Sequence, residues 1–196
     1  TNFDVSAESA LLVSMDKGDV LYSKNIHEKR YPASLTKIMT ALLLIENTSD
    51  LDKETITVSD NAVNSLLGTD SSIGGFKPGE QMTARQMLYN LLLSSANDGA
   101  VAIAEHVSGS VDSFVALMNK RAQGLNMNDT HFVNPHGLYD PNHYTTAYDL
   151  YLLTTEALKY SVFKEIVSTK RYSMPATNMS AAKTLSNSNM MIDAST

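Results

Sequence analysis

The segment Tyr31-Pro32-Ala33-Ser34-Leu35-Thr36-Lys37-Ile38-Met39-Thr40-Ala41-Leu42-Leu43-Leu44-Ile45 carries most of the information about the fold. Pro32 precedes a run without helix breakers, and this pattern predicts a helix from about Ser34 to Asn47. Apolar residues cover nearly all sides of this helix, which is typical of a helix buried in the core. A buried helix rarely opens with polar residues, so those at its start are candidates for function.

The composition is that of an ordinary globular domain. The chain has 196 residues, of which 43% are hydrophobic and 18% charged, enough for one sizeable core. A formal net charge of -6 gives no electrostatic reason to expect nucleic acid as a partner. The chain has no cysteine, which excludes disulfides, a thiol nucleophile and thiolate metal sites.

No stretch of the sequence has the pattern of a membrane span. The longest apolar run, Ile38 to Ile45, is far too short to cross a bilayer. No basic region precedes an apolar one at Thr1. We therefore expect any export signal to have been removed or never to have existed.

Strands are predicted near both ends of the chain and helices between them. Asp16-Lys17-Gly18-Asp19 predicts a hairpin turn between strands at Ser9–Met15 and Val20–Lys24, and Lys170–Met174 predicts a returning strand. This order predicts an α/β (α+β) fold, an antiparallel sheet flanked by helices, with an all-helical lobe at about 51–145 inserted into it.

Capping signals place the helices of this middle part. Thr83-Ala84-Arg85-Gln86 is a capping box, and Ser110 has the position of a helix cap. The predicted elements are a strand at Glu54–Val58, helices at about Asn61–Leu67, Thr83–Leu93, Asp98–Val107, Ser110–Gly124 and Thr146–Tyr160, and a long loop at His131–Thr145.

Ser34-Leu35-Thr36-Lys37 fits the Ser-x-x-Lys pattern, which also begins at Ser14 and at Ser161. A serine and a lysine three positions apart meet only on a helix. Ser14 lies at a strand end and Ser161 is predicted to be an exposed helix cap, so only Ser34 begins a buried helix. A buried Lys37 with a lowered pKa can take the proton of the Ser34 hydroxyl. In the alternative interpretation Ser34 only caps the helix and Lys37 extends into solvent.

Ser95-Ala96-Asn97 fits the accompanying Ser-x-Asn pattern. It interrupts two apolar helices, where a buried polar cluster or a helix cap is expected. Ser95 can relay a proton between Lys37 and a leaving nitrogen, and the Asn97 carboxamide can bind a substrate amide. Ser59-Asp60-Asn61 also matches the pattern, but Ser59 is explained as the cap of a short helix.

With these elements placed, the sequence resembles the D-alanyl-D-alanine carboxypeptidases, the low-molecular-weight penicillin-binding proteins. The resemblance rests on 31–41 and on three further stretches: Leu92-Leu93-Ser94-Ser95-Ala96-Asn97-Asp98-Gly99-Ala100, Phe132-Val133-Asn134-Pro135-His136-Gly137-Leu138, and His143-Tyr144-Thr145-Thr146-Ala147-Tyr148-Asp149-Leu150. Alanine stands at 96 where the family often has glycine.

The resemblance implies a β-lactamase/transpeptidase-like fold with the active site between the sheet and the helical lobe. Members remove the terminal D-alanine from peptidoglycan stem pentapeptides through an acyl-serine, here acyl-Ser34, which water hydrolyses. β-Lactams acylate the same serine. The resemblance implies no metal and no cofactor, a location on the outer face of the cytoplasmic membrane, and membrane contact only through sequence absent from this chain.

One departure concerns the third family element, a Lys-Thr-Gly strand that follows a segment like Leu185-Ser186-Asn187-Ser188-Asn189. The chain ends at Thr196 before such a strand, and Lys183-Thr184-Leu185 lacks the glycine and precedes that segment. We therefore expect residues 1–196 to be one incomplete penicillin-binding domain that lacks its C-terminal strands and has little activity alone, because losing one oxyanion donor typically costs about 10²–10³ in rate.

Other functions stay open. A serine β-lactamase shares both motifs but needs fast deacylation, and no glutamate stands out for that role. A catalytically silent domain that binds cell-wall peptides is the second alternative, and an esterase or amidase of the same fold the third. The histidines at 131, 136 and 143 lack the compact spacing of zinc enzymes, so we expect them to stabilise the loop.

Overall fold

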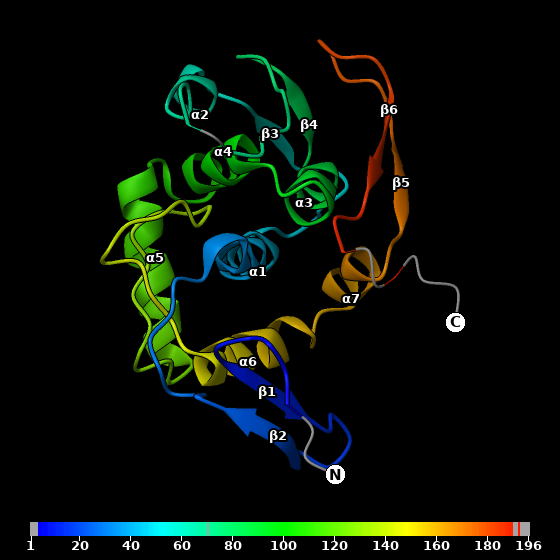
Figure 1. The fold of residues 1–196 in the computed structure, drawn as a ribbon. Helices are drawn as coiled ribbons and strands as arrows, with labels where there is room; N and C mark the ends of the chain where they lie inside the picture. Colours follow the sequence, from blue (N-terminus) through cyan, green and yellow to red (C-terminus); the bar gives the residue numbers. More distant parts are fainter. Residues whose placement is uncertain (1–3, 70, 190–191, 193–196) are drawn as a thin grey trace.

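Helix α1 (Lys37–Asn47) lies in the middle of the molecule, with α3, α4, α5 and α6 packed around it (Figure 1). The computed structural model describes residues 4–69, 71–189 and 192. Ala41, Leu42, Leu43 and Leu44 of α1 are at most 1% exposed, because apolar side chains on every side of the helix meet a neighbouring helix. The predicted buried helix is confirmed, although its first turn, Ala33–Thr36, is a 3₁₀ helix.

The predicted caps begin the surrounding helices. The Ser59 hydroxyl accepts from the Ala62 N–H, Thr83 and Gln86 form the capping box, and Ser110 accepts from the Ser113 N–H. Each cap satisfies a backbone N–H that the first helical turn leaves without a partner. The helices are α2 (Asp60–Asn64), α3 (Ala84–Leu93), α4 (Asn97–Ser108), α5 (Val111–Gly124), α6 (Ala147–Ala157) and α7 (Ser161–Val167).

The strands form three separate antiparallel pairs among the described residues. They are β1 (Ala10–Val13) with β2 (Val20–Lys24), β3 (Thr55–Thr57) with β4 (Gln81–Thr83), and β5 (Arg171–Met174) with β6 (Lys183–Ser186). The first pair closes through the predicted turn, where Gly18 has a φ of +73° that glycine adopts without strain. In Figure 1 the pairs lie around the helices, β1–β2 beside α6 and β5–β6 beside α3 and α7.

Several element boundaries differ from the sequence prediction. The helix predicted from Thr146 to Tyr160 ends at Ala157, and α7 begins at Ser161. The N-cap of α7 is Tyr160, so Ser161 is the first helical residue and not the cap. The stretch 51–145 holds α2, α3, α4 and α5 but also the β3–β4 pair, so it is not all helical. Its identity as a separate lobe stays a prediction.

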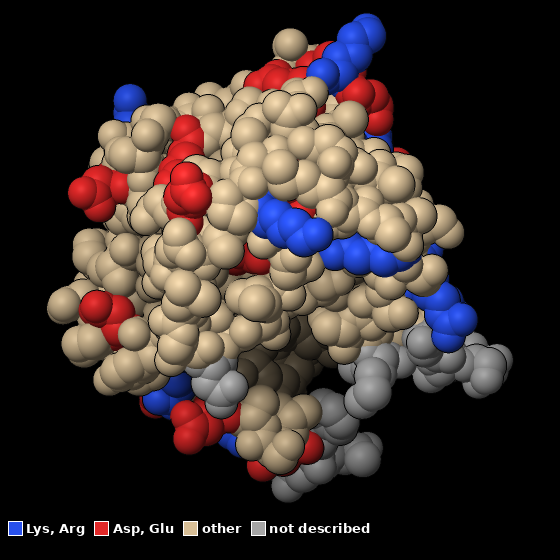
Figure 2. Space-filling model, turned by 90° about the horizontal axis from the view of Figure 1, so that it is seen from above, with Lys and Arg blue, Asp and Glu red and all other residues tan. Residues whose placement is uncertain are grey.

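Among the described residues no single helix is long and apolar enough to cross a membrane. Only α4 and α5 taken together pass a test of length and hydropathy, and they are bent by 84° relative to each other. The α4 residues Asn97–Ala104 are buried inside the protein. On the face shown in Figure 2, acidic and basic side chains are scattered over a mostly uncharged surface that is hollowed near its lower edge.

Candidate active site

Ser34 lies in the 3₁₀ turn that leads into α1. The turn begins after Pro32 with Ala33 at a φ of +48°, a left-handed conformation that is uncommon outside glycine. The Ser34 side chain is exposed, whereas Thr36 and Lys37 directly behind it are buried. The turn therefore presents the hydroxyl at the surface, directly before the buried start of α1.

Lys37 is the first residue of α1 and is only 2% exposed. Its Nζ lies 3.3 Å from the Ser34 Oγ and donates a hydrogen bond of 2.8 Å to the His136 carbonyl oxygen. Burial lowers the pKa of Lys37 to about 8, because desolvation disfavours the charged amine. Roughly a tenth of the amine is then neutral at pH 7, so this lysine can accept a proton where an exposed one cannot.

Ser95 lies in the tight connection between α3 and α4, with a φ of +55°. Its Oγ is 3.0 Å from the Ser34 Oγ. Asn97 begins α4, is 5% exposed and lines the same pocket as Ser34. The structure thus brings the four residues singled out in the sequence to one place.

The loop Asn134–Leu138 closes this site from the other side. The Asn134 Oδ1 accepts from the Gly137 N–H at 2.6 Å, and its Nδ2 donates to the Leu138 carbonyl at 2.9 Å. The Thr40 hydroxyl on α1 donates to the Pro135 carbonyl at 2.6 Å. These bonds hold the His136 carbonyl at the Lys37 amine. Sequence reasoning missed this contact, because a backbone carbonyl 99 residues away leaves no local pattern.

His143 is 1% exposed and joins this loop to the turn that carries Ser34. Its Nδ1 accepts from the Val133 N–H at 3.0 Å, so Nε2 carries the proton and donates to the Thr36 Oγ1 at 2.7 Å. Burial lowers the pKa of His143 to about 4, which keeps the ring neutral. The expected loop-stabilising role fits these bonds, and among the described residues no group of histidines and carboxylates could hold a metal ion.

Two hollows adjoin Ser34. One of about 680 Å³ also includes Lys37, Ser95 and the apolar residues Leu91 and Phe163. The other, of about 320 Å³, lies between Ser71 and Ser72 on one side and the loop at His136–Tyr139 on the other. A substrate chain that reaches Ser34 therefore has room on both sides of the hydroxyl.

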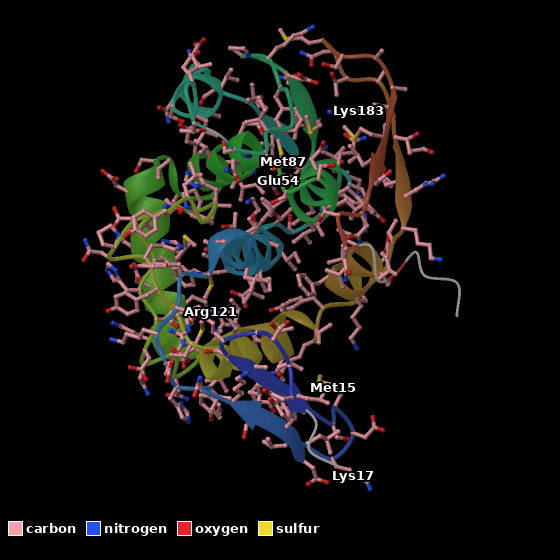
Figure 3. All side chains as sticks on the ribbon, in the orientation of Figure 1. Met15, Lys17, Glu54, Met87, Arg121 and Lys183 are labelled. Carbon is pink, nitrogen blue, oxygen red and sulfur yellow. The ribbon has the colours of Figure 1, made fainter. Side chains whose placement is uncertain are left out.

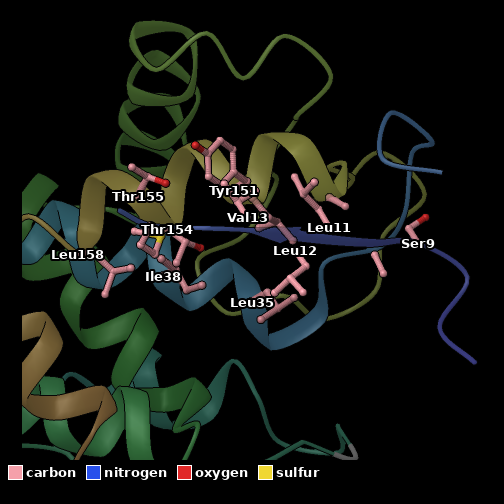
Figure 4. Close-up of a pocket in the computed structure, with 14 residues that line it drawn as sticks. Ser9, Leu11, Leu12, Val13, Leu35, Ile38, Tyr151, Thr154, Thr155 and Leu158 are labelled. Atoms are coloured by element: carbon pink, nitrogen blue, oxygen red, sulfur yellow. The ribbon is translucent and has the colours of Figure 1, made fainter. Parts of the chain in front are cut away.

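The hollow shown in Figure 4 is of a different kind. It has a volume of about 390 Å³ and lies between β1 and α6. Leu11, Val13, Ile38 and Leu158 are typical of its mainly apolar lining, which contains neither Ser34 nor Lys37 nor Ser95. Its lining contains no lysine, histidine or carboxylate.

The alternative motif matches lie in other surroundings. Ser161 and Lys164 share helix α7, but both are exposed, so burial and not helix geometry distinguishes Lys37. Ser59 caps α2 and its hydroxyl also contacts Glu105. Lys183 donates to the Gly74 carbonyl at 2.9 Å.

Comparison with curated proteins finds relatives over most of the chain. The chain is 44% identical over 167 residues to D-alanyl-D-alanine carboxypeptidase DacF of Bacillus subtilis and 33% identical over 171 residues to D-alanyl-D-alanine carboxypeptidase DacA of Escherichia coli. These alignments cover 83% and 82% of this chain but 42% of each relative. The chain therefore spans about two fifths of the length of these curated relatives.

Solved structures confirm the predicted fold class. The Streptomyces K15 DD-transpeptidase has a TM-score of 0.91 at 28% identity, over 98% of this chain and 77% of that one. Penicillin binding protein 6B from Escherichia coli has a TM-score of 0.88 at 29% identity, over 100% of this chain and 62% of that one. A family model described as D-alanyl-D-alanine carboxypeptidase matches residues 1–196. The chain therefore belongs to the D-alanyl-D-alanine carboxypeptidase family.

Proposed function

We propose that this chain carries the nucleophile and the proton-transfer groups of a serine DD-carboxypeptidase that removes the terminal D-alanine from peptidoglycan stem peptides. The observation that carries the proposal is the 3.3 Å distance between the Ser34 Oγ and the Nζ of a buried lysine. A serine hydroxyl becomes a good nucleophile only when a base takes its proton.

In the acylation step, the Ser34 Oγ attacks the carbonyl carbon of the penultimate D-alanine while its proton passes to the Lys37 Nζ. Ser95, 3.0 Å from the Ser34 Oγ, passes a proton to the leaving nitrogen as the peptide bond breaks and D-alanine departs. The Asn97 carboxamide offers both a donor and an acceptor for a substrate amide. Lys37 then passes its proton to the Ser95 oxygen, which returns both groups to their starting forms.

In the deacylation step, water attacks the ester carbon of acyl-Ser34, and the Ser34 oxygen regains a proton as the shortened peptide leaves. A β-lactam is attacked at its ring carbonyl in the same way, and the opened ring stays attached to Ser34. The substrate places this activity outside the cytoplasm, at the cell envelope. Stem peptides ending in D-Ala-D-Ala and β-lactams are the expected ligands.

The proposal is tested by labelling the full-length protein with a fluorescent penicillin. We expect Ser34→Ala to abolish labelling. Ser161→Ala is the matched control, because Ser161 begins the other helical Ser-x-x-Lys and should be dispensable. Labelling that survives in Ser34→Ala would refute the assignment of the nucleophile.

The fate of the adduct separates the remaining alternatives. A long-lived adduct together with release of D-alanine from a stem pentapeptide supports the carboxypeptidase. Rapid turnover of a chromogenic cephalosporin indicates a β-lactamase. Absence of any adduct on the full-length protein indicates a domain that only binds cell-wall peptides.

A further inference from the structure

The segment Ser71–Phe76, which we call the wall segment, forms one side of the smaller hollow beside Ser34. Ser71 and Ser72 line this hollow opposite His136 and Tyr139. The wall segment has no helical or strand structure of its own. Its position must therefore be fixed by groups outside it.

Asp98 on α4 supplies the main anchor. The Asp98 carboxylate is 3% exposed and accepts backbone N–H groups from Gly74 at 2.7 Å, Gly75 at 3.1 Å and Phe76 at 3.4 Å. It also accepts the N–H of Gly99 at 2.9 Å, in the first turn of its own helix. Hydrogen bonds from N–H groups to an ionised carboxylate are stronger than those between neutral groups.

Asn97, the neighbour of Asp98, adds a backbone bond to the same segment. Its N–H donates to the Ser72 carbonyl at 3.0 Å. The wall segment is thus attached to the first turn of α4, where Asn97 lines the same pocket as Ser34. A shift of the wall segment would change the hollow while leaving the Ser34–Lys37 pair in place.

Lys183 anchors the wall segment from the opposite side. Its Nζ donates to the Gly74 carbonyl at 2.9 Å and lies 5.3 Å from the centre of the Phe76 ring. In Figure 3 Lys183 extends from β6 toward the part of the molecule that holds β4. Gly74 therefore donates a hydrogen bond through its N–H to Asp98 on α4 and accepts one on its carbonyl from Lys183 on β6. Lys183 is exposed, so its contribution should be the smaller one.

We propose that Asp98 and Lys183 are positioning residues that hold the wall segment as a fixed side of the substrate pocket, and that this side sets how tightly the acyl part of the substrate is bound. The inference rests on the proposed function for its substrate, but the anchoring itself does not depend on catalysis. The small serine side chains at 71 and 72 leave room for an extended peptide, to which their hydroxyls can hydrogen-bond.

The first experiment measures the anchoring directly, by amide hydrogen exchange of the full-length protein. In Asp98→Asn we expect the amides of Gly74 and Gly75 to exchange at least about tenfold faster, because the amide oxygen that remains lacks the charge. Asp149→Asn is the matched control: Asp149 is also 3% exposed, in the first turn of a helix, and accepts a loop N–H from Asp129. This control should leave the Gly74 and Gly75 amides unchanged.

The second experiment measures peptide hydrolysis by the same variants. Asp98→Asn should raise KM for a D-Ala-D-Ala peptide about tenfold and lower kcat less, because the reacting groups stay in place. Lys183→Met, at an exposed position that tolerates substitution, should raise KM about threefold. The double variant should show less than the product of the two effects, since both residues hold one segment.

Unchanged exchange at Gly74 and Gly75 in Asp98→Asn overturns the anchoring. Faster exchange with an unchanged KM, or the same rise in KM in Asp149→Asn, overturns the role of the wall segment in substrate binding. A wild-type protein that neither binds penicillin nor hydrolyses the peptide contradicts the proposed function instead. The exchange experiment then still decides whether Asp98 holds the segment.

Discussion

A β-carbon placed on Gly137 would lie 1.8 Å from the carbonyl oxygen of Ala33. Gly137 also has a φ of +92°, a conformation that residues with a side chain rarely adopt. The loop that carries the His136 carbonyl can therefore approach the catalytic turn only because position 137 has no side chain. This contact sets the geometry of Ser34 and Lys37.

Gly137→Ala is predicted to destabilise the protein by about 3 kcal/mol or more, because it adds a steric clash to backbone strain. Gly109→Ala is the control. Gly109 has a φ of +75° but nothing within 4 Å of the added carbon. The Gly109→Ala variant should therefore lose only about 1–2 kcal/mol of unfolding free energy, through backbone strain alone. Urea denaturation measures both values. Equal losses in the two variants would show that the close approach to Ala33 does not constrain the site.

Local signals predicted much of the fold. The turn at Gly18 and the capping box at Thr83 depend on residues within a few positions, so the sequence reveals them. The continuous apolar pattern predicted a buried α1, and the comparisons confirm the fold class.

Features that depend on distant partners were not predicted. Strand β4 has three residues and pairs with β3 across the whole of α2, and β6 was missed although its partner β5 was predicted. The end of α6 at Ala157, three residues before the predicted end at Tyr160, carries no glycine or proline signal. The contacts of Asp98 with the wall segment likewise join residues 22 to 24 positions apart, beyond the reach of a local pattern.

The rate of acylation by penicillin is predicted to depend on the protonation of Lys37. Burial lowers the pKa of Lys37 to about 8, and only the neutral amine can accept the Ser34 proton. The rate should therefore rise with pH, reach half its maximum near the pKa and level off above it. A stopped-flow profile between pH 6 and pH 10 tests this, and a rate that falls as pH rises through this range contradicts it.

Lys37→Arg tests the same role without a change of pH. Arginine keeps its charge throughout this range, so acylation should fall by about 10²–10⁴. Lys164→Arg, in the exposed Ser-x-x-Lys of α7, is the matched control. Penicillin should acylate this variant at the wild-type rate. If penicillin acylates the Lys37→Arg variant at the wild-type rate, Lys37 is excluded as the base.

The free energy of unfolding is predicted to decrease at acid pH, because the native protein keeps His143 neutral. Burial lowers the pKa of His143 to about 4 from its usual 6.5, so between these values the unfolded chain binds a proton that the native protein does not. The free energy of unfolding then decreases as pH falls from 6.5 toward 4, by up to about 1.4 kcal/mol per pH unit for this histidine. In His143→Gln the dependence of the unfolding free energy on pH should be weaker by about this amount. Urea titrations at several pH values measure it, with the exposed His27→Gln as a control for loss of a histidine.

Arg121 joins three helices near the far end of α1. Its guanidinium donates to both carboxylate oxygens of Glu46 on α1, at 2.6 to 3.2 Å, and to Glu156 on α6 at 2.9 Å. Tyr160 adds a bond to Glu46 at 3.2 Å. The two carboxylates are less than 20% exposed. Removal of the guanidinium leaves the largely buried Glu46 without a charged partner, whereas Glu156 keeps Lys159 at 2.6 Å.

Arg121→Ala is therefore predicted to lose about 3 kcal/mol of unfolding free energy. Arg121→Lys should recover only part of this loss, because an ammonium cannot bind both oxygens of Glu46 and reach Glu156 as the planar guanidinium does. Lys120→Ala, at the exposed neighbouring position, controls for loss of a positive charge on α5 and should cost less than about 0.5 kcal/mol. Full recovery in Arg121→Lys would mean that net charge, rather than the paired geometry of the guanidinium, holds α1 against α5 and α6.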